Sequence, residues 1–127
     1  MQMTSCRKDT SGAEIKLTKQ LLEDKIWYLD YTQRLESGVV QSTKSYVGQS
    51  TYFIDFLSDN STTDSDGLVG TFHITKTSGM LQIHVTARTS GGNNVEYVYD
   101  LLSVGAKNLV LSVQEGTVQS KYYYSSK

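Results

Sequence analysis

The 127-residue sequence has no proline, one cysteine and no long apolar run. Without proline, no rigid proline-rich linker divides the chain, and its length suits one domain with a short tail. The single cysteine, Cys6, excludes an internal disulfide. The longest apolar runs are too short for a transmembrane helix. With 12 basic and 13 acidic residues the chain has no basic face, so nucleic-acid binding is not expected.

Tyrosine, with nine copies, serine and threonine are abundant instead, and this composition favours strands over helices. Residues 15–24 predict a short helix, because Leu17, Leu21 and Leu22 fall on one side, with Thr18 as its N-cap. From Lys25 onward, apolar and aromatic residues recur with a period of two, which is typical of strands.

Seven or eight such segments follow one another, separated by short turns and by a polar loop at residues 59–67. No helix is long enough to connect parallel strands, so we expect antiparallel pairing. Successive hairpins close most simply into a barrel, which also removes unpaired edges. The sequence therefore predicts an all-β protein, an antiparallel up-and-down barrel of seven or eight strands with a short N-terminal helix.

Two hairpin turns make this prediction specific. A two-residue turn at Ser78-Gly79 pairs residue 77 with residue 80, which brings four apolar side chains to one face: Phe72, Ile74, Ile83 and Val85. A turn at Glu115-Gly116 pairs residue 114 with residue 117 and likewise aligns the apolar residues of the last two strands. Both registers agree with a barrel that is apolar inside.

The N-terminus carries a lipobox-like pattern. An apolar Met3 lies three residues before Cys6, and the small Ser5 lies directly before it. A polar stretch at residues 7–16 follows, of the kind that tethers a domain to a lipid anchor. The charged start and apolar segment of a signal peptide would have to precede Met1. Lipidation of Cys6 and an incidental cysteine in a frayed terminus both stay open.

Several features now occur in a recognisable order: the cysteine and its polar tether, a helix leading into a tryptophan, an aromatic strand with an acidic turn, a glycine-anchored strand and a late aromatic segment. In this sequence they read Cys6, Leu21 to Leu29, Tyr52 to Asp59, Gly67 to Ile74, and Tyr99 to Ser103. This order resembles the small lipocalin-like, calycin-type lipoproteins of the Bacteroidota over about residues 17–124. The resemblance implies a lipocalin-like barrel at 17–127, a disordered tail or lipoprotein tether at 1–16, and a binding role.

Aromatic residues on the inward side of the strands are the candidate ligand contacts: Trp27, Tyr31, Tyr52, Phe72, Tyr97, Tyr99 and Tyr122. An eight-stranded barrel encloses space for its own side chains or for one small ligand. Buried tyrosine hydroxyls need partners, which other tyrosines, water or a ligand can supply. A self-filled core, with Trp27 closing one end of the barrel, is the competing interpretation.

No constellation for catalysis or metal binding is visible. His73 and His84 are predicted to face each other on the outside of a hairpin, without the third ligand that zinc requires. The acidic loop at 59–67 does not fit the spacing of an EF-hand. Acidic residues within the predicted strands fall on the outward side, so paired inward carboxylates are absent. We therefore expect neither enzymatic activity nor a cofactor.

These observations lead to a non-enzymatic, lipocalin-like binding protein that holds a small apolar or amphipathic ligand. The resemblance places it in the cell envelope, periplasmic or anchored to the outer membrane through a lipid on Cys6, which would be its only membrane contact. The alternative is a solid-core barrel that acts as an interaction module and contacts another protein or a glycan.

Overall fold

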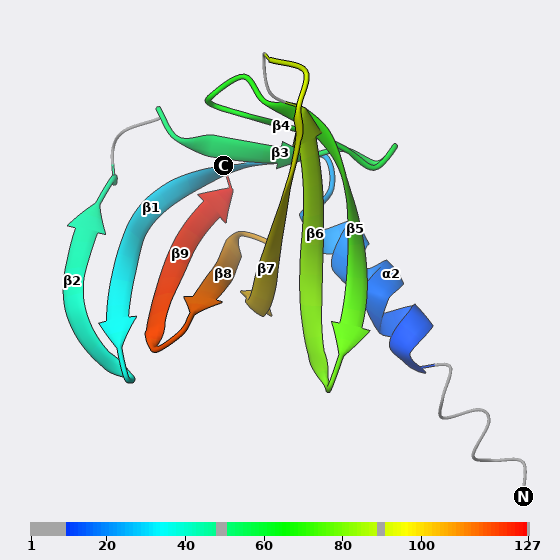
Figure 1. The fold of residues 1–127 in the computed structure, drawn as a ribbon. Helices are drawn as coiled ribbons and strands as arrows, with labels where there is room; N and C mark the ends of the chain where they lie inside the picture. Colours follow the sequence, from blue (N-terminus) through cyan, green and yellow to red (C-terminus); the bar gives the residue numbers. More distant parts are fainter. Residues whose placement is uncertain (1–9, 48–50, 89–90, 127) are drawn as a thin grey trace, which may run out of the picture.

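A computed structural model describes residues 10–47, 51–88 and 91–126 of the protein. A helix, α2 (Thr10–Leu22), precedes nine strands (Figure 1). The strands are β1 (Lys25–Glu36), β2 (Val39–Ser45), β3 (Phe53–Phe56), β4 (Ser61–Asp64), β5 (Val69–Thr77), β6 (Met80–Arg88), β7 (Asn94–Val104), β8 (Asn108–Glu115) and β9 (Val118–Ser126).

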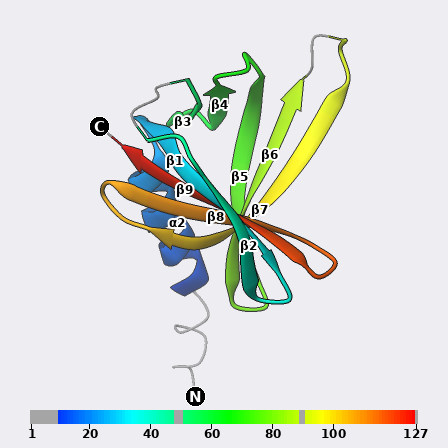
Figure 2. The same ribbon diagram turned by 90° about the vertical axis from the view of Figure 1, so that its left-hand side faces the viewer.

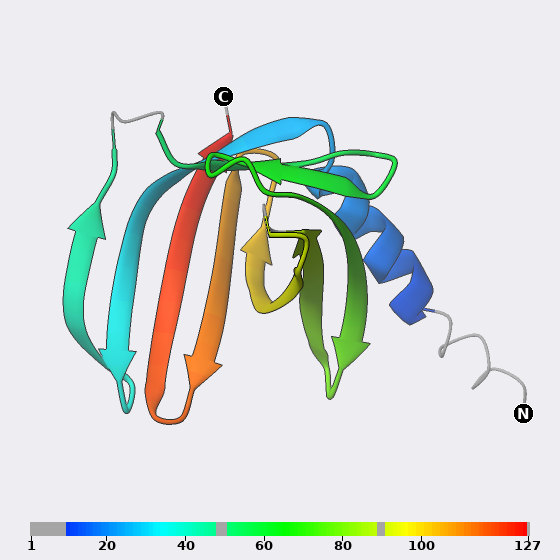
Figure 3. The ribbon, with the colours of Figure 1, turned by 45° about the horizontal axis from the view of Figure 1, so that its top comes forward.

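The strands form one antiparallel sheet that closes on itself. β1 pairs with β9 on one side, and on the other side with β3 near its start and β2 near its end. β1 and β3 to β9 thus make a closed eight-stranded barrel, and β2 extends the sheet beyond it as a flap beside β1 (Figure 3). The antiparallel barrel with a short N-terminal helix, predicted from the periodicity, is confirmed. The stretch predicted as a polar loop contains β4, because Ser61 to Asp64 pairs with both β3 and β5.

The first predicted hairpin is correct and the second is displaced. Ser78 and Gly79 both have positive φ, 52° and 81°, as a type I′ turn requires, and Thr77 lies opposite Met80. The last hairpin turns at Gly116-Thr117 and not at Glu115-Gly116, so its pairing is shifted by two residues. Gly116 takes the positive φ, 64°, at the first turn position, as in a type II′ turn. A shift of two residues keeps the same side chains inside.

One end of the barrel, which we call the closed end, is filled by apolar side chains and covered by α2. Trp27 and Leu22 are fully buried, and the indole Nε1 of Trp27 donates to the carbonyl of Leu22 at 3.0 Å. The core around them consists of Leu22, Trp27, Phe56, Phe72, Ile83, Val85, Leu101, Leu109 and Leu111. The tryptophan therefore fixes the end of the helix to the barrel interior.

The helix begins earlier than its apolar spacing predicts. Residues 10–14, which lie before the predicted start of the helix, form its first turns, because they contain helix formers such as Ala13 and Glu14 and no breaker other than Gly12. Thr18 is buried within the helix and is not its N-cap, since its hydroxyl donates to the carbonyl of Glu14 at 2.8 Å. Leu17, predicted to face the core, is 58% exposed.

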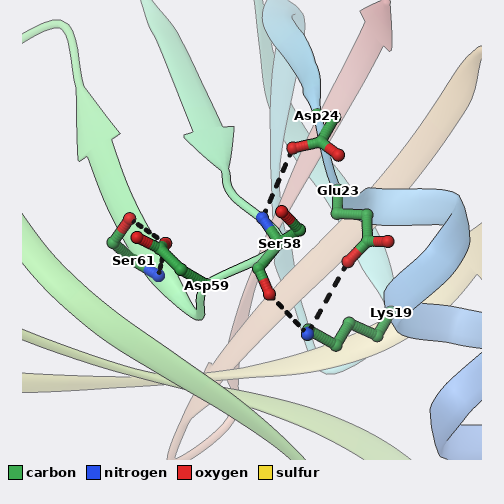
Figure 4. A network of polar contacts seen from close by, with 6 residues as sticks. All are labelled: Lys19, Glu23, Asp24, Ser58, Asp59 and Ser61. Atoms are coloured by element: carbon green, nitrogen blue, oxygen red, sulfur yellow. Dashed lines mark hydrogen bonds and ion pairs between the residues drawn. The ribbon is translucent and has the colours of Figure 1, made fainter.

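Polar contacts tie the C-terminal end of the helix to the turn between β3 and β4 (Figure 4). Lys19 Nζ donates to the carbonyl of Ser58 at 2.8 Å and lies 3.7 Å from the carboxylate of Glu23. The amide of Ser58 donates to Asp24 Oδ1 at 3.3 Å. These contacts hold the helix over the closed end and leave the other end of the barrel free of it.

Candidate ligand site

Three adjoining hollows lie around a single tyrosine, Tyr99, and we call the part of the barrel that they occupy the open end. The first has a volume of about 200 Å³ and lies between β3, β4, β6 and β7. The second, about 160 Å³, lies between β1, β3 and β9. The third, about 400 Å³, opens sideways between β7 and the β8–β9 hairpin. Tyr99 borders all three, so it is the centre of the candidate site.

The sideways opening exists because β7 and β8 pair over only part of their length. Their register runs from Asp100 opposite Ser112 to Val104 opposite Leu109. Among the described strands, the first half of β7 pairs with β6 alone. It diverges from β8, as Figure 2 shows where the yellow start of β7 projects away from orange β8. Tyr97, Tyr99 and other side chains of the two strands thereby border a gap that leads to the barrel interior.

Tyrosine rings form the walls of these hollows. Tyr99 meets Tyr122 edge-on, with ring centroids 6.4 Å apart and planes at 89°, and Tyr97 lies 6.4 Å from Tyr99 with planes at 22°. Burial raises the pKa of Tyr99 to about 12, and burial likewise raises the pKa of Tyr124 above its ordinary value. Among the described residues, none hydrogen-bonds to the hydroxyls of Tyr97, Tyr99, Tyr122 or Tyr124. These phenol hydroxyls can therefore donate and accept hydrogen bonds that the described chain does not make.

Two carboxylates stand beside these rings. Asp64, at the end of β4, and Asp66 both border the two smaller hollows. Asp64 is half-buried, and its Oδ1 accepts the backbone amides of Asp66 at 3.0 Å and Leu68 at 3.1 Å. The sequence analysis missed both residues because it treated the segment as a loop. The run Ser61-Thr62-Thr63, with its β-branched residues, was the available signal for a strand there.

The predicted contact residues divide into three groups. Tyr52, Tyr97, Tyr99 and Tyr122 border the hollows, and Tyr52 lies at the rim with 43% of its surface exposed. Trp27 and Phe72 belong instead to the closed end, where Phe72 packs edge-on against Phe56 with ring centroids 5.0 Å apart. Neither of them borders a hollow among those described, so both serve the core in this arrangement.

The inward position predicted for Tyr31 is wrong, because β1 contains a bulge. Leu29 lies opposite Tyr124 but Tyr31 lies opposite Tyr123, so Asp30 is an extra residue. The insertion reverses the alternation of side chains along the strand. Tyr31 consequently stacks on Tyr123 on the outer face, with ring centroids 4.2 Å apart and planes at 15°.

The two histidines pair across β5 and β6 in the register predicted. Their rings stack with centroids 4.6 Å apart, and His84 Nε2 lies 2.9 Å from the hydroxyl of Thr75. Glu96, on the neighbouring strand β7, lies 3.9 Å from His84 Nδ1, a neighbour that the hairpin register alone did not identify. Within residues 10–47, 51–88 and 91–126, no three His, Cys, Asp or Glu side chains are grouped to hold a metal ion.

Cys6, the predicted lipidation site, lies outside the described residues. In the part of the chain that is described, no helix has the length and apolar character needed to cross a membrane. Comparison of the chain with protein-family models, with curated proteins and with solved structures finds no match.

Proposed function

We propose that this protein is a non-enzymatic, lipocalin-like binding protein that holds one small apolar or amphipathic molecule at the open end of its barrel. The position of Tyr99 carries this proposal. Its ring borders all three hollows, while its hydroxyl finds no hydrogen-bond partner in the described chain. A ligand with an apolar body and a polar group would contact the ring and satisfy the hydroxyl together.

The size of the hollows limits the ligand. A cavity of roughly 150 Å³ is sufficient for one benzene ring. Each of the two smaller hollows, at about 200 and 160 Å³, therefore suits a body of about one ring. Both are below the roughly 300–1,000 Å³ of pockets that enclose drug-sized molecules. Side chains fill the closed end of the barrel, whereas the hollows leave unfilled space at the open end.

The resemblance to envelope lipoproteins supports a second part of the proposal, that a lipid on Cys6 anchors the barrel to the outer membrane. A diacylated or triacylated cysteine supplies the two or more chains that stable anchoring needs. Mass spectrometry of the protein isolated from its native cells tests this directly. We expect the mass of a lipid on the peptide that contains Cys6 and its loss in Cys6→Ser; an unmodified cysteine would refute anchoring.

Native mass spectrometry of the full chain, purified without detergent, tests the binding function. We expect a discrete mass above that of the chain, and the same molecule in an organic extract of the sample. Tyr99→Ala, which removes the central ring, should lose the added mass, whereas Tyr123→Ala, which changes the outer face, should keep it. A bare chain mass that persists after incubation with cell-envelope extract would contradict a carrier.

One observation favours the alternative, an interaction module. Among the strands that the structure describes, β2 pairs only with β1. It is exposed along its whole length and carries the exposed apolar side chains of Val39 and Val40. Such an edge can accept a strand from another protein. Val40→Lys would then abolish capture of the partner without altering a bound small molecule. The open-end variants described above would have the opposite pattern, so the two functions can be separated.

A further inference from the structure

The walls of the three hollows carry charge of only one sign. Asp64 and Asp66 border the two smaller hollows, and Glu96 and Glu115 border the sideways opening. No described lysine, arginine or histidine borders any of the three. The whole chain is close to neutral, with 12 basic and 13 acidic residues, so composition alone does not explain an acidic open end.

Asp64 is held in a fixed position. Two backbone amides, those of Asp66 and Leu68, donate to its Oδ1 and hold the side chain in the position where it borders the two smaller hollows. Its Oδ2 makes no hydrogen bond or ion pair with any residue that the structure describes. Burial is the main cause of the raised pKa values of Tyr99 and Tyr124, neighbouring tyrosines come next, and the negative charge of Asp64 makes the smallest contribution, as expected for a carboxylate near those phenols.

The rings next to this carboxylate can attract a cation through their faces. Tyr99 and Tyr122 stand at 89° to each other, and both border the second hollow together with Asp64. Aromatic faces carry partial negative charge and bind ammonium groups. Phenol oxygens also accept hydrogen bonds from an N–H donor. Tyr97 and Tyr52 extend the aromatic wall to the rim of the barrel.

Other ligand chemistries fit these walls less well. An anionic ligand would meet Asp64 and Asp66 with no cationic side chain to compensate for the repulsion. A purely apolar ligand would remove water from the free oxygen of Asp64 and supply nothing in return, which is unfavourable. An ammonium group pairs with that oxygen while the rest of the molecule contacts the rings and apolar side chains such as Ile54 and Val85.

We propose that the ligand is a small organic cation, an amine with a ring-sized apolar body, whose ammonium group lies against Asp64 and the rings of Tyr99 and Tyr122. This inference rests on the proposed binding function, which could hold for a neutral ligand as well. The ammonium group supplies the positive charge that the open end lacks, and the aromatic walls receive the apolar body.

Three probes of nearly the same shape test the charge preference: 2-phenylethylamine, 2-phenylethanol and 3-phenylpropanoate. Binding to the full chain is measured by calorimetry and by the NMR signals of its tyrosine rings. We expect the amine to bind about tenfold more tightly than the alcohol, and the carboxylate to bind most weakly, because only the amine forms a charge-assisted contact.

Matched variants locate the charge partner. Asp64→Asn keeps an oxygen that can accept the two loop amides but removes the charge, and it should weaken amine binding about tenfold while leaving alcohol binding unchanged. Asp59→Asn is the control, because Asp59 also accepts loop hydrogen bonds, from Ser61, but borders no described hollow. It should change the affinity for none of the probes. If Asp64→Asn does not fold, Asp66→Asn removes a charge from the same hollows.

The outcomes separate this inference from the function on which it rests. Equal or tighter binding of the alcohol or the carboxylate, with shifts at the Tyr99 ring, would overturn the cationic ligand and leave a binding protein for neutral or anionic molecules. An amine affinity that Asp64→Asn does not alter would also overturn it. If none of the three probes shifts the rings of Tyr97, Tyr99 or Tyr122, the proposed binding function fails together with the inference.

Discussion

Tyr99 meets Tyr122 edge-on at the open end of the barrel, with ring centroids 6.4 Å apart and ring planes at 89°. Neither hydroxyl has a hydrogen-bond partner in the described part of the protein. The next residue of β9, Tyr123, points to the outer face and donates its hydroxyl to Gln33 at 3.1 Å. One strand therefore carries an unpaired phenol inside and a paired phenol outside, which gives a direct test of what the inner hydroxyls are for.

Removing the hydroxyls of Tyr122 and Tyr123 should have different effects on stability. Tyr122→Phe removes no hydrogen bond to any residue that the structure describes, so we expect the free energy of unfolding to change by less than about 0.5 kcal/mol. Tyr123→Phe leaves Gln33 without its donor and should cost about 0.5–1.5 kcal/mol. Urea unfolding of both variants measures the difference. A loss in Tyr122→Phe as large as that in Tyr123→Phe would show that the inner hydroxyl has a structural role.

We expect Trp27 to stabilise the fold and not to contact the ligand. Its side chain is fully buried, and its indole N–H donates a hydrogen bond to the carbonyl of Leu22. Trp27→Ala should therefore lower the free energy of unfolding by about 3–5 kcal/mol. Ile26, its neighbour in β1, is 42% exposed, and Ile26→Ala should cost much less. Trp27→Phe keeps most of the buried ring, so the affinity for a bound molecule should be unchanged in this variant. A large loss of affinity in folded Trp27→Phe would place the ligand at the closed end.

Gly70 is required by the close approach of β5 to β6. A Cβ added there would overlap the carbonyl oxygen of Thr86 and lie 2.8 Å from the Cα of Ala87. We expect Gly70→Ala to lower the free energy of unfolding by about 1–3 kcal/mol, since two backbones would have to move apart. Gly105→Ala is the control, because a Cβ at Gly105 meets nothing within 4 Å. Thermal unfolding that is unchanged by Gly70→Ala would contradict this close packing.

Alkaline pH should destabilise the protein through its inner phenols. Burial raises the pKa of Tyr99 from 10.0 to about 12, so between these values the unfolded chain loses its proton first. The folded state then binds more protons than the unfolded state, and stability falls as pH rises through this range. The stabilising contribution is fully present below pH 10.

Ultraviolet titration of tyrosine, run in parallel with urea unfolding at each pH, measures this effect. Some phenols should ionise at a higher pH than free tyrosine. Tyr99→Phe should remove part of the absorbance change at this higher pH, and it should reduce the loss of unfolding free energy as the pH rises. Tyr123→Phe, on the outer face, serves as the comparison. If every phenol ionised near the ordinary value while the protein stayed folded, the inner rings could not be buried as described.

The sequence was sufficient for the barrel because alternation along a strand is a local property. The turn at Ser78-Gly79 and the inward side chains of β5 and β6 follow directly from it. Local rules do not reveal an inserted residue, and the bulge at Asp30 therefore put Tyr31 on the wrong face. The first turns of α2 were missed because they carry few apolar residues, and helices of this kind depend on contacts elsewhere in the fold.

The candidate site was predicted only in part. Tyr52, Tyr97, Tyr99 and Tyr122 were found because aromatic residues on the inward parity are visible in the sequence. Asp64 was missed, because the short strand β4 is held by its neighbours β3 and β5, which lie elsewhere in the chain. The gap between β7 and β8 was likewise hidden, since it depends on where two strands stop pairing.

NMR spectra of the protein with labelled tyrosine rings, recorded while an organic extract of its native cells is added, test the central claim most directly. A small molecule bound at the open end should shift the rings of Tyr99 and Tyr122 in a saturable manner and leave Tyr31 and Tyr123, which stack on the outer face, unchanged. Shifts confined to the amides of β2, or no saturable shift at any inner ring, would contradict a ligand site inside the barrel.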